Sequence, residues 1–268
     1  MHPIRRILCP VDSQDLGDRA VCQAAALARW KEAELLLLHV AAPDAARPVF
    51  PQTMAEALRA AGVKVRWAVD HGAAVERILA HATAFEADLL VLRATRGDGR
   101  QAGGPVAGRL LETASCPVLV VPEPWQGAEQ DGRRAPFGQI LCPVDFSVPA
   151  RAGLRAAGLL AHDAGARLTM LHVVPGSGAA GQESRGATDA ALESLARLHS
   201  EDHLDRLAVD GVITGGSAPS AILLIADDLL ADLIVLGVGA GGATSRRVTA
   251  GSACPVLSVR SGAPAPTP

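Results

Sequence analysis

The sequence contains no tyrosine, and aromatic residues make up only 3% of its 268 residues. Binding of single-stranded nucleic acid by stacking of bases on aromatic side chains is therefore excluded. The 25 basic and 28 acidic residues are interspersed and give a net charge of -3. This balance lacks the basic footprint that nucleic acids and anionic membranes require, so we expect neither kind of partner.

Long apolar runs are also missing: none approaches the roughly 20 residues that cross a bilayer, and no charged start precedes an apolar signal core. We therefore expect a cytosolic protein. The five cysteines show no Cys-x-x-Cys spacing, and all lie in apolar strand or helix patterns. This favours small buried side chains in a reducing compartment over disulfides or metal ligands.

What the sequence does contain is a long internal repeat. The string Ile-Leu-Cys-Pro-Val-Asp occurs at Ile7–Asp12 and again at Ile140–Asp145, and Leu38-His39-Val40 returns as Leu171-His172-Val173. Both repeats have the same offset, since 140 minus 7 and 171 minus 38 each give 133. A shared register over this distance indicates a duplicated domain.

Two later blocks repeat with different offsets. Ala87–Leu92 returns as Ala231–Leu236 at an offset of 144, and Cys116–Leu119 returns as Cys254–Leu257 at 138. The second copy has thus gained 11 residues (144 minus 133) before its fourth block and lost 6 (144 minus 138) after it. We predict one domain over residues 1–122, an exposed linker over 123–136 that is rich in Pro, Gly and charge, a second domain over 137–262, and a disordered tail over 263–268.

Short apolar runs alternate with helical periodicity in both copies. The expected strands are residues 4–11, 34–40, 63–69, 88–92 and 118–121, and then 139–144, 167–174, 207–213, 232–236 and 256–259. Apolar residues between them recur at the i, i+3 or i+4, i+7 spacing of a helix. Continuous apolar strands separated by helices predict an α/β fold: in each copy an open, doubly wound parallel sheet covered on both faces, with right-handed crossovers.

In such a sheet, ligands bind at the carboxyl ends of the strands where the strand order reverses. Asp12 and Asp145 follow the first strand of each copy. A carboxylate there can accept hydrogen bonds from a sugar hydroxyl. It can equally cap the following helix, since Ser13 and Ser147 come just before helical patterns, and the residues alone leave both readings open.

These motifs resemble those of the universal stress protein family in its tandem form. The resemblance is carried by the Ile-Leu-Cys-Pro-Val-Asp opening, the Leu-His-Val strand, the turns at Gly72-Ala73-Ala74 and Gly216–Pro219, the Ala-Asp-Leu-x-Val-Leu strand and the final Cys-Pro-Val. It extends from Ile4 to Arg260. It implies an adenine nucleotide alpha hydrolase-like sheet of strand order 3-2-1-4-5.

The resemblance also implies, for ATP-binding relatives, a phosphate loop Gly-x2-Gly-x9-Gly-Ser/Thr after the fourth strand. The first copy departs from it: Arg93 and Arg96 stand at the leading glycines, and Gly104 precedes Pro105 after seven intervening residues instead of nine. Proline has no amide hydrogen for a phosphate. Arg93, Arg96, Arg100 and Arg109 could hold an anion, or be ordinary solvated side chains.

The second copy has only Gly237–Gly242 and then Thr244 and Ser245 in this place, which is too short to wrap a triphosphate but could form a small anion nest. The candidate cofactor-binding residues are Pro10, Asp12, Val40, Arg93, Arg96 and Gly104 in the first copy and Pro143, Asp145, Val173, Gly237, Gly239 and Gly242 in the second. We expect no tightly held cofactor; ATP or AMP is the alternative.

No catalytic or metal-binding constellation is present. There is no Gly-x-Ser-x-Gly elbow and no Gly-Lys-Ser/Thr phosphate loop. His39 and His172 lie among apolar neighbours and are expected to be structural, whereas the loop residue His71 has Gly215 as its counterpart. We therefore expect no enzyme.

The sequence thus favours a nucleotide-independent stress-response protein that acts through protein contacts. An ATP or AMP sensor and, third, a nucleotide or phosphoester hydrolase are the alternatives. The apolar fifth strands Val118–Val121 and Val256–Val259 are expected at sheet edges, where open strands aggregate. We expect them to pair with one another as a pseudo-twofold pair of domains, with association into a homodimer as a further alternative.

Overall fold

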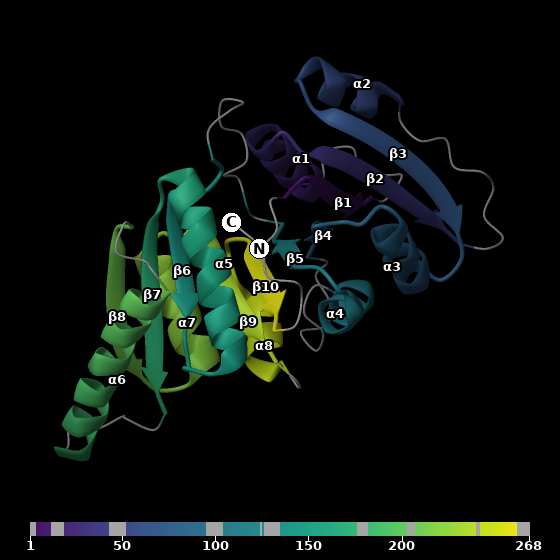
Figure 1. Cartoon of the computed structure of the whole chain (residues 1–268). Coiled ribbons are helices and arrows are strands. Elements are labelled where there is room, and N and C mark those ends of the chain that lie inside the picture. The colour runs from purple at the N-terminus through teal and green to yellow at the C-terminus, as the bar shows by residue number, and fades with distance from the viewer. Residues whose placement is uncertain are drawn as a thin grey trace. The chain divides into compact units, whose positions relative to one another are not determined.

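The computed structural model describes residues 4–11, 19–42, 52–94, 104–123, 125, 135–175, 182–202, 207–239 and 242–261. Contacts divide the chain into two compact units (Figure 1), unit 1 with residues 1–136 and 264–268 and unit 2 with residues 137–263. Among the described helices, none is both long enough and apolar enough to cross a membrane.

Unit 1 alternates strands and helices. Its elements are β1 (Arg6–Pro10), α1 (Arg19–Lys31), β2 (Glu34–Ala41), α2 (Gln52–Ala60), β3 (Lys64–His71), α3 (Ala74–Ala84), β4 (Leu89–Arg93), α4 (Gly104–Thr113) and β5 (Val118–Val121). The strands pair in parallel and lie in the order β3-β2-β1-β4-β5. The predicted doubly wound topology is confirmed for this unit.

Unit 2 repeats this arrangement with β6 (Gln139–Pro143), α5 (Val148–Ala164), β7 (Arg167–Val174), α6 (Gln182–Glu201), β8 (Val209–Gly215), α7 (Ala218–Asp228), β9 (Leu233–Val238), α8 (Ala243–Gly251) and β10 (Val256–Arg260). Its parallel strands lie in the order β8-β7-β6-β9-β10, which is the same 3-2-1-4-5 topology. β5 and β10 are the last strands of these two series, and the pairing of their edges stays a prediction.

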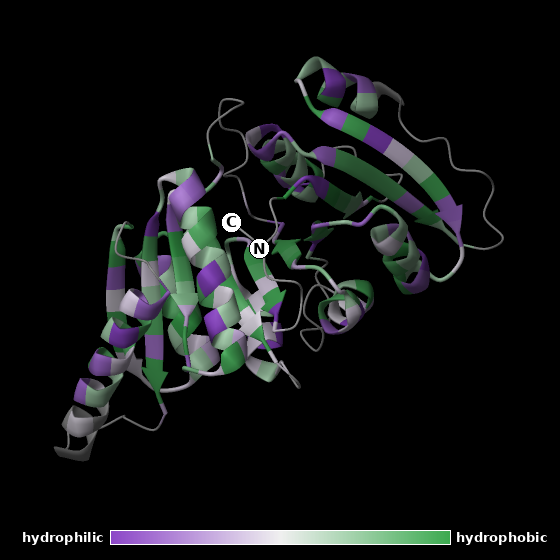
Figure 2. Ribbon diagram, in the orientation of Figure 1, coloured by the Kyte–Doolittle hydropathy of each residue, from purple (hydrophilic) through white to green (hydrophobic). Residues whose placement is uncertain are grey.

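The core of unit 1 follows from the alternation of side chains along its strands. One face packs against α3 and α4, and its buried side chains include Leu8, Leu38, Leu90 and Val120 from the strands and Ile78, Leu110 and Leu111 from the helices. The intervening residues Ile7, Leu37 and Val91 are fully buried as well. Both faces of the inner strands are therefore covered, as the continuous apolar runs predict, whereas the edge strand β3 alternates between hydrophilic and hydrophobic colours in Figure 2.

The edge strands β3 and β8 end two residues later than the apolar pattern predicts. β3 continues through Asp70 and His71 because both pair with β2, opposite Val40 and Ala41. The end of a strand is thus set by the length of its parallel neighbour and not by hydrophobicity alone.

The aspartate of the repeated Ala-Asp-Leu motif joins the starts of two strands. The Asp88 carboxylate accepts hydrogen bonds from the amides of Arg5 and Arg6, both at 2.9 Å. In unit 2, Asp232 accepts from Gly138 at 2.7 Å and from Gln139 at 2.9 Å. The motif therefore has a structural explanation, since it satisfies amides that precede the sheet ladder.

One residue of the predicted exposed linker packs onto unit 1. Trp125 is half-buried, and its indole nitrogen donates a hydrogen bond of 3.1 Å to the side-chain oxygen of Gln23. Gln23 lies on α1 and is fully buried, which the apolar pattern of that helix does not predict. The beginning of the linker is therefore attached to α1.

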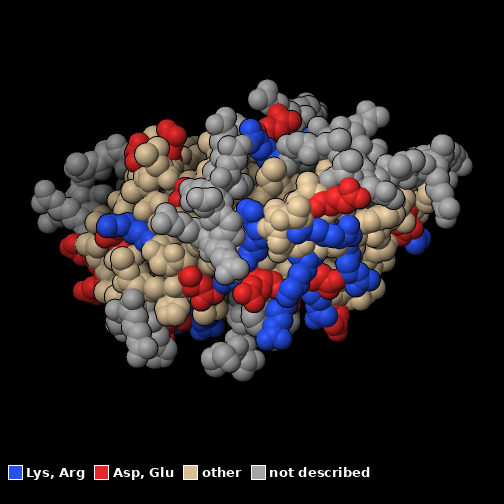
Figure 3. Space-filling model, turned by 90° about the horizontal axis from the view of Figure 1, so that it is seen from above, with Lys and Arg blue, Asp and Glu red and all other residues tan. Residues whose placement is uncertain are grey.

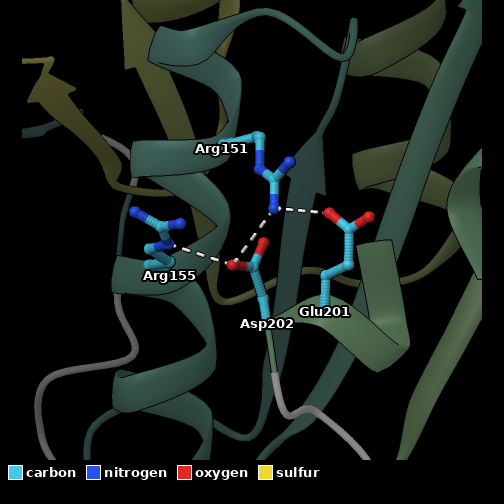
Figure 4. A network of polar contacts seen from close by, with 4 residues as sticks. All are labelled: Arg151, Arg155, Glu201 and Asp202. Atoms are coloured by element: carbon cyan, nitrogen blue, oxygen red, sulfur yellow. Dashed lines mark hydrogen bonds and ion pairs between the residues drawn. The ribbon is translucent and has the colours of Figure 1, made fainter. Parts of the chain in front are cut away.

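The 11 residues gained by the second copy are accounted for by the length of one helix. α6 has 20 residues and α2, its counterpart, has 9, and the difference is 11. The end of α6 is held to α5 by a network of charges (Figure 4) in which Asp202 lies 3.0 Å from Arg155 and 3.7 Å from Arg151. Arg151 also contacts Glu201 at 2.8 Å. The insertion thus lengthens α6, which packs on β7 and β8.

Basic and acidic side chains lie beside one another on the surface shown in Figure 3. In unit 1, for example, Arg6 contacts Glu86 at 2.6 Å and Arg66 contacts Glu34 at 3.5 Å. These pairs agree with the interspersed charges of the sequence.

Candidate functional site

The candidate site of each unit is the end of its sheet where the strand order reverses. In unit 1, β1 pairs with β2 on one side and with β4 on the other, and in unit 2 β6 pairs in the same way with β7 and β9. The helices that follow β1 and β4 lie on opposite faces of the sheet, as do those that follow β6 and β9. In sheets of this topology a ligand binds in the crevice between two such helices, at the carboxyl ends of the strands.

Four of the six candidate residues of unit 1 are described. Pro10 and Arg93 are the last residues of β1 and β4, Val40 lies near the end of β2, and Gly104 is the first residue of α4. All four sit at the carboxyl-terminal end of the sheet. The other two candidates, Asp12 and Arg96, lie outside the described residues, as does Arg100.

In unit 2, Pro143 ends β6, Val173 lies near the end of β7, and Asp145 follows β6. The Asp145 carboxylate accepts hydrogen bonds from the backbone amide of Ser147 at 3.0 Å and from its hydroxyl at 2.5 Å. Ser147 is the N-cap of α5, and its side chain accepts from the amide of Ala150 at 3.3 Å. The cap of α5 is therefore Ser147 and not Asp145, which binds the capping residue; binding of a sugar hydroxyl by Asp145 stays a prediction.

The two repeated histidines make equivalent structural contacts. His39 Nδ1 lies 3.0 Å from the carbonyl oxygen of Val11, and His172 Nδ1 lies 2.8 Å from that of Val144. Each ring thus donates to the backbone just after the first strand of its unit. In unit 2 the ring of Phe146 also packs on His172, with centroids 4.6 Å apart. These contacts agree with the structural role predicted for both histidines.

The end of β9 and the residue that follows it are packed against the first turn of α5. A Cβ atom on Gly237 would lie 1.8 Å from the carbonyl oxygen of Pro149 and 2.7 Å from the amide nitrogen of Ala150. A Cβ on Gly239 would lie 3.1 Å from Cγ of Pro149. Glycine at 237 is therefore required by the approach of two backbones, whether or not a ligand binds.

The same approach requires a second glycine on the helix. A Cβ on Gly153 would lie 2.5 Å from the backbone nitrogen of Gly237. The equivalent residues of unit 1 are Ala20 (153 minus 133) and Arg93 (237 minus 144). Unit 1 cannot reproduce this contact, because the Cβ atoms of Ala20 and Arg93 would need the space that backbone atoms fill in unit 2.

The remaining loop glycines lie at the starts of helices. Gly242 precedes α8 with φ +36°, and Gly104 begins α4 with φ +90°, backbone conformations that favour glycine. Pro105 follows Gly104 and offers no amide hydrogen. Arg109, on the same helix, is exposed and lies 3.5 Å from Glu112, an arrangement typical of a solvated surface arginine.

A polar cluster in unit 1 has no counterpart in unit 2. His81 Nε2 on α3 lies 3.0 Å from Oδ2 of Asp70, Arg77 lies 4.0 Å from the same oxygen, and the backbone amide of His71 donates to Oδ1 at 2.8 Å. The equivalents of Asp70 and His81, at an offset of 144, are Thr214 and Ile225. No motif in the sequence indicates this pair, because Asp70 and His81 lie 11 residues apart on different elements.

This cluster lowers the pKa of the Asp70 carboxyl. The main cause is the hydrogen bond from the His71 amide; burial opposes it, and His81 and Arg77 act in the same direction as His71. A carboxyl whose pKa is lower in the folded than in the unfolded chain stabilises the fold above about pH 4, and this contribution is lost as the pH falls through the folded value.

We therefore expect Asp70→Asn to reduce the acid sensitivity of the protein. Between about pH 7 and about pH 3, the wild type should lose more free energy of unfolding than the variant, by less than about 1 kcal/mol because the pair is partly solvated. Urea unfolding at both pH values measures the difference. Asp228→Asn, at an exposed aspartate, is the control. Equal acid sensitivity of wild type and Asp70→Asn would contradict the prediction.

Three of the five cysteines are buried and one is partly buried, whereas all five were expected to be buried. Cys9, Cys142 and Cys254 are buried and Cys116 is partly buried, whereas Cys22 is exposed. The prediction was wrong for Cys22, which lies between the buried residues Val21 and Gln23 but on the solvent side of α1. Burial raises the pKa of the Cys116 thiol to about 11 and that of Cys142 to about 12, so both stay protonated at neutral pH.

Comparisons with known proteins cover nearly the whole chain. The family model of the universal stress protein family matches residues 3–122 and again residues 136–260. No curated protein matches the chain. A solved structure of a functionally unknown protein from Pseudomonas aeruginosa PAO1 is similar with a TM-score of 0.71 and 22% identity, over 96% of this chain and 92% of that one. A universal stress protein from Archaeoglobus fulgidus DSM 4304 is similar with a TM-score of 0.66 and 18% identity, over 96% and 98%.

Proposed function

The chain belongs to the universal stress protein family and carries its domain twice, and from this premise we propose that it is a stress-response protein that acts through contacts with other proteins, without catalysis and without a resident nucleotide. We place it in the cytosol. No disulfide is assigned among the described cysteines, which is consistent with a reducing compartment.

The observation that carries this proposal is the packing of Pro149 against Gly237, near the end of β9, and against Gly239, which follows the strand. A phosphate cradle needs backbone amides that face an open space. In unit 2 the carbonyl group and ring of Pro149 lie against Gly237 and Gly239, and the Asp145 carboxylate is engaged by Ser147. The chain's own first turn of α5 therefore takes up contacts that a ligand would need.

The alternative is an ATP- or AMP-binding stress sensor, and unit 1 is the better candidate for it. In unit 1, Arg93 stands at the position of Gly237, and its side chain excludes the close contact that α5 and β9 make in unit 2. α4 still begins at Gly104 with a left-handed backbone, φ +90°. Against a phosphate stands Pro105, which removes one amide donor from the start of that helix.

Titration calorimetry of the intact chain with ATP, ADP and AMP, each with and without magnesium, tests the proposal. We expect no saturable heat at millimolar ligand. Saturable heat would contradict nucleotide independence and favour the sensor. Loss of this saturable heat in the Arg93→Ala variant would then assign the ligand to unit 1. Phosphate release above background that Asp145→Ala abolishes would instead favour the hydrolase.

The proposal includes the pairing of the apolar edges Val118–Val121 and Val256–Val259 with one another. Such edges expose unpaired backbone groups unless another strand covers them. A homodimer in which a second chain covers them is the alternative, and sedimentation of the intact chain distinguishes a monomer from a dimer.

A further inference from the structure

The carboxyl-terminal end of α7 in unit 2 exposes large apolar side chains. Leu224 is 61% exposed and Leu230, which follows the helix, is 81% exposed. Leu223, Ile225 and Leu229, in the same two turns, are only partly buried. We call Leu224, Asp227, Asp228 and Leu230 the α7 surface.

Leu230 is unfavourable for folding in two respects. Its backbone has φ +50°, a left-handed conformation in which a helix usually ends on glycine. The conformation is fixed by two hydrogen bonds, from the Leu230 amide to the Asp227 carbonyl at 3.0 Å and from the Ala231 amide to the Ala226 carbonyl at 2.8 Å. A leucine with a strained backbone and an exposed side chain contributes little to the stability of its own unit. Its presence points to a contact with another molecule.

Unit 1 has no such surface, although its helix ends in the same way. The residues equivalent to Leu224 and Leu230, at an offset of 144, are Ala80 and Glu86. Glu86 has almost the same backbone, φ +49°, but a charged side chain that is exposed and pairs with Arg6 at 2.6 Å. The fold therefore tolerates a polar residue at this turn, and the leucines are specific to unit 2.

The α7 surface is also negatively charged. Asp227 and Asp228 are exposed, and within the described part of the chain neither side chain has a hydrogen bond or ion pair. No basic residue lies in the last turn of α7. Two carboxylates at a helix carboxyl terminus add to the negative end of the helix dipole, so this end of α7 favours a cation.

We propose that the α7 surface docks an amphipathic helix of another protein, whose apolar stripe covers Leu224 and Leu230 and whose flanking lysines or arginines meet Asp227 and Asp228. α7 leads into the start of β9, where Asp232 binds the amides of Gly138 and Gln139. The surface thus lies at the amino-terminal end of the sheet, opposite the crevice. This inference rests on the proposed function in that it names a site for the protein contacts.

A fluorescent helical peptide with leucines at every third or fourth position and lysines elsewhere is the probe, and its binding to the intact chain is followed by fluorescence anisotropy. We expect Leu224→Ala combined with Leu230→Glu, which installs the residues of unit 1, to weaken binding about tenfold or more. Asp227→Asn with Asp228→Asn should weaken it about threefold and reduce its salt dependence. Leu159→Ala, at a leucine that is 45% exposed on α5, is the matched control and should bind as the wild type does.

Equal binding of a peptide with glutamates in place of the lysines would overturn the proposal, and so would unchanged binding of the lysine peptide by the Leu224→Ala, Leu230→Glu variant. A third contrary result would be a wild-type protein that is a dimer and a variant that is a monomer, because the occupant of the surface would then be a second copy of this chain. Circular dichroism verifies that each variant is folded. Saturable nucleotide heat in calorimetry would overturn the proposed function and leave the peptide result standing, so the two failures are distinguishable.

Discussion

Gly237→Ala is expected to lower the free energy of unfolding of unit 2 by about 3 kcal/mol or more, at the upper end of overpacking effects. The added Cβ would lie 1.8 Å from the carbonyl oxygen and 2.3 Å from the carbonyl carbon of Pro149. Both are backbone atoms, so no side chain can rotate away. The first turn of α5 must move off β9, which disturbs the cap formed by Ser147. Urea unfolding followed by circular dichroism measures the loss.

Two other glycines serve as controls for this result. Gly153→Ala should also be strongly destabilising, because its Cβ would lie 2.5 Å from the backbone nitrogen of Gly237. Gly186, on α6, has no atom within 4 Å of an added Cβ, so Gly186→Ala should stabilise that helix by about 0.5–1 kcal/mol. A free energy of unfolding for Gly237→Ala within about 0.5 kcal/mol of the wild type would show that the close packing of α5 on β9 is not present.

Asp202→Asn is expected to cost about 2–4 kcal/mol, because it removes the negative charge from between two arginines. The Asp202 side chain is only 3% exposed, and its Oδ1 lies 3.0 Å from Arg155 Nε and 3.7 Å from Arg151. Among the described residues, its Oδ2 and the Nε of Arg151 have no hydrogen-bond partner. The loss should appear in the unfolding of unit 2, since the network attaches the end of α6 to α5 (Figure 4).

The exposed pair Arg109–Glu112 is the control for this charge network. Its side chains are 67% and 46% exposed at 3.5 Å, so Glu112→Gln should change the free energy of unfolding by less than about 0.5 kcal/mol. If Asp202→Asn is equally neutral, the network does not hold α6 in place. Added salt should reduce the effect of Asp202→Asn less than that of Glu112→Gln, because buried charges are screened less.

The two units have diverged at the positions that decide whether the crevice is filled. Gly153 and Gly237 allow α5 to contact β9 in unit 2, whereas Ala20 and Arg93 exclude the same contact in unit 1. The lengthened α6 and its anchor Asp202 also belong to unit 2 alone. One copy has thus gained internal contacts at its crevice, and the duplicated fold has been kept in both.

Sequence periodicity predicted the elements of both units well. The strands and helices follow from apolar runs and helical spacing, and the strand order follows from the family resemblance. The ends of β3 and β8 were predicted two residues too early, because pairing with a longer neighbour continues the strand beyond its apolar residues. The burial of Gln23 was also missed, because its hydrogen-bond partner Trp125 comes from a distant part of the chain. The exposure of Cys22 was missed because this residue stands in an apolar stretch of α1 whose other residues are nearly all buried.

The sequence predicted where the candidate residues lie in the fold but not what they contact, and their role as a binding site stays a prediction. The sequence placed Asp145, Gly237 and Gly239 at the carboxyl end of the sheet. It could not show that Asp145 binds Ser147 or that Pro149 lies against both glycines, because these contacts depend on how closely a helix approaches a strand.

The sequence by itself therefore determined the duplication, the α/β class and the parallel topology, because periodicity and repeats are properties of neighbouring residues along one chain. Only the tertiary structure decided what the glycines at the end of β9 are packed against, what holds α6 and which leucines in and after α7 stay exposed. Each of these depends on distances between backbones that are far apart in sequence, and a shift of a few ångströms there changes an open space into a filled one.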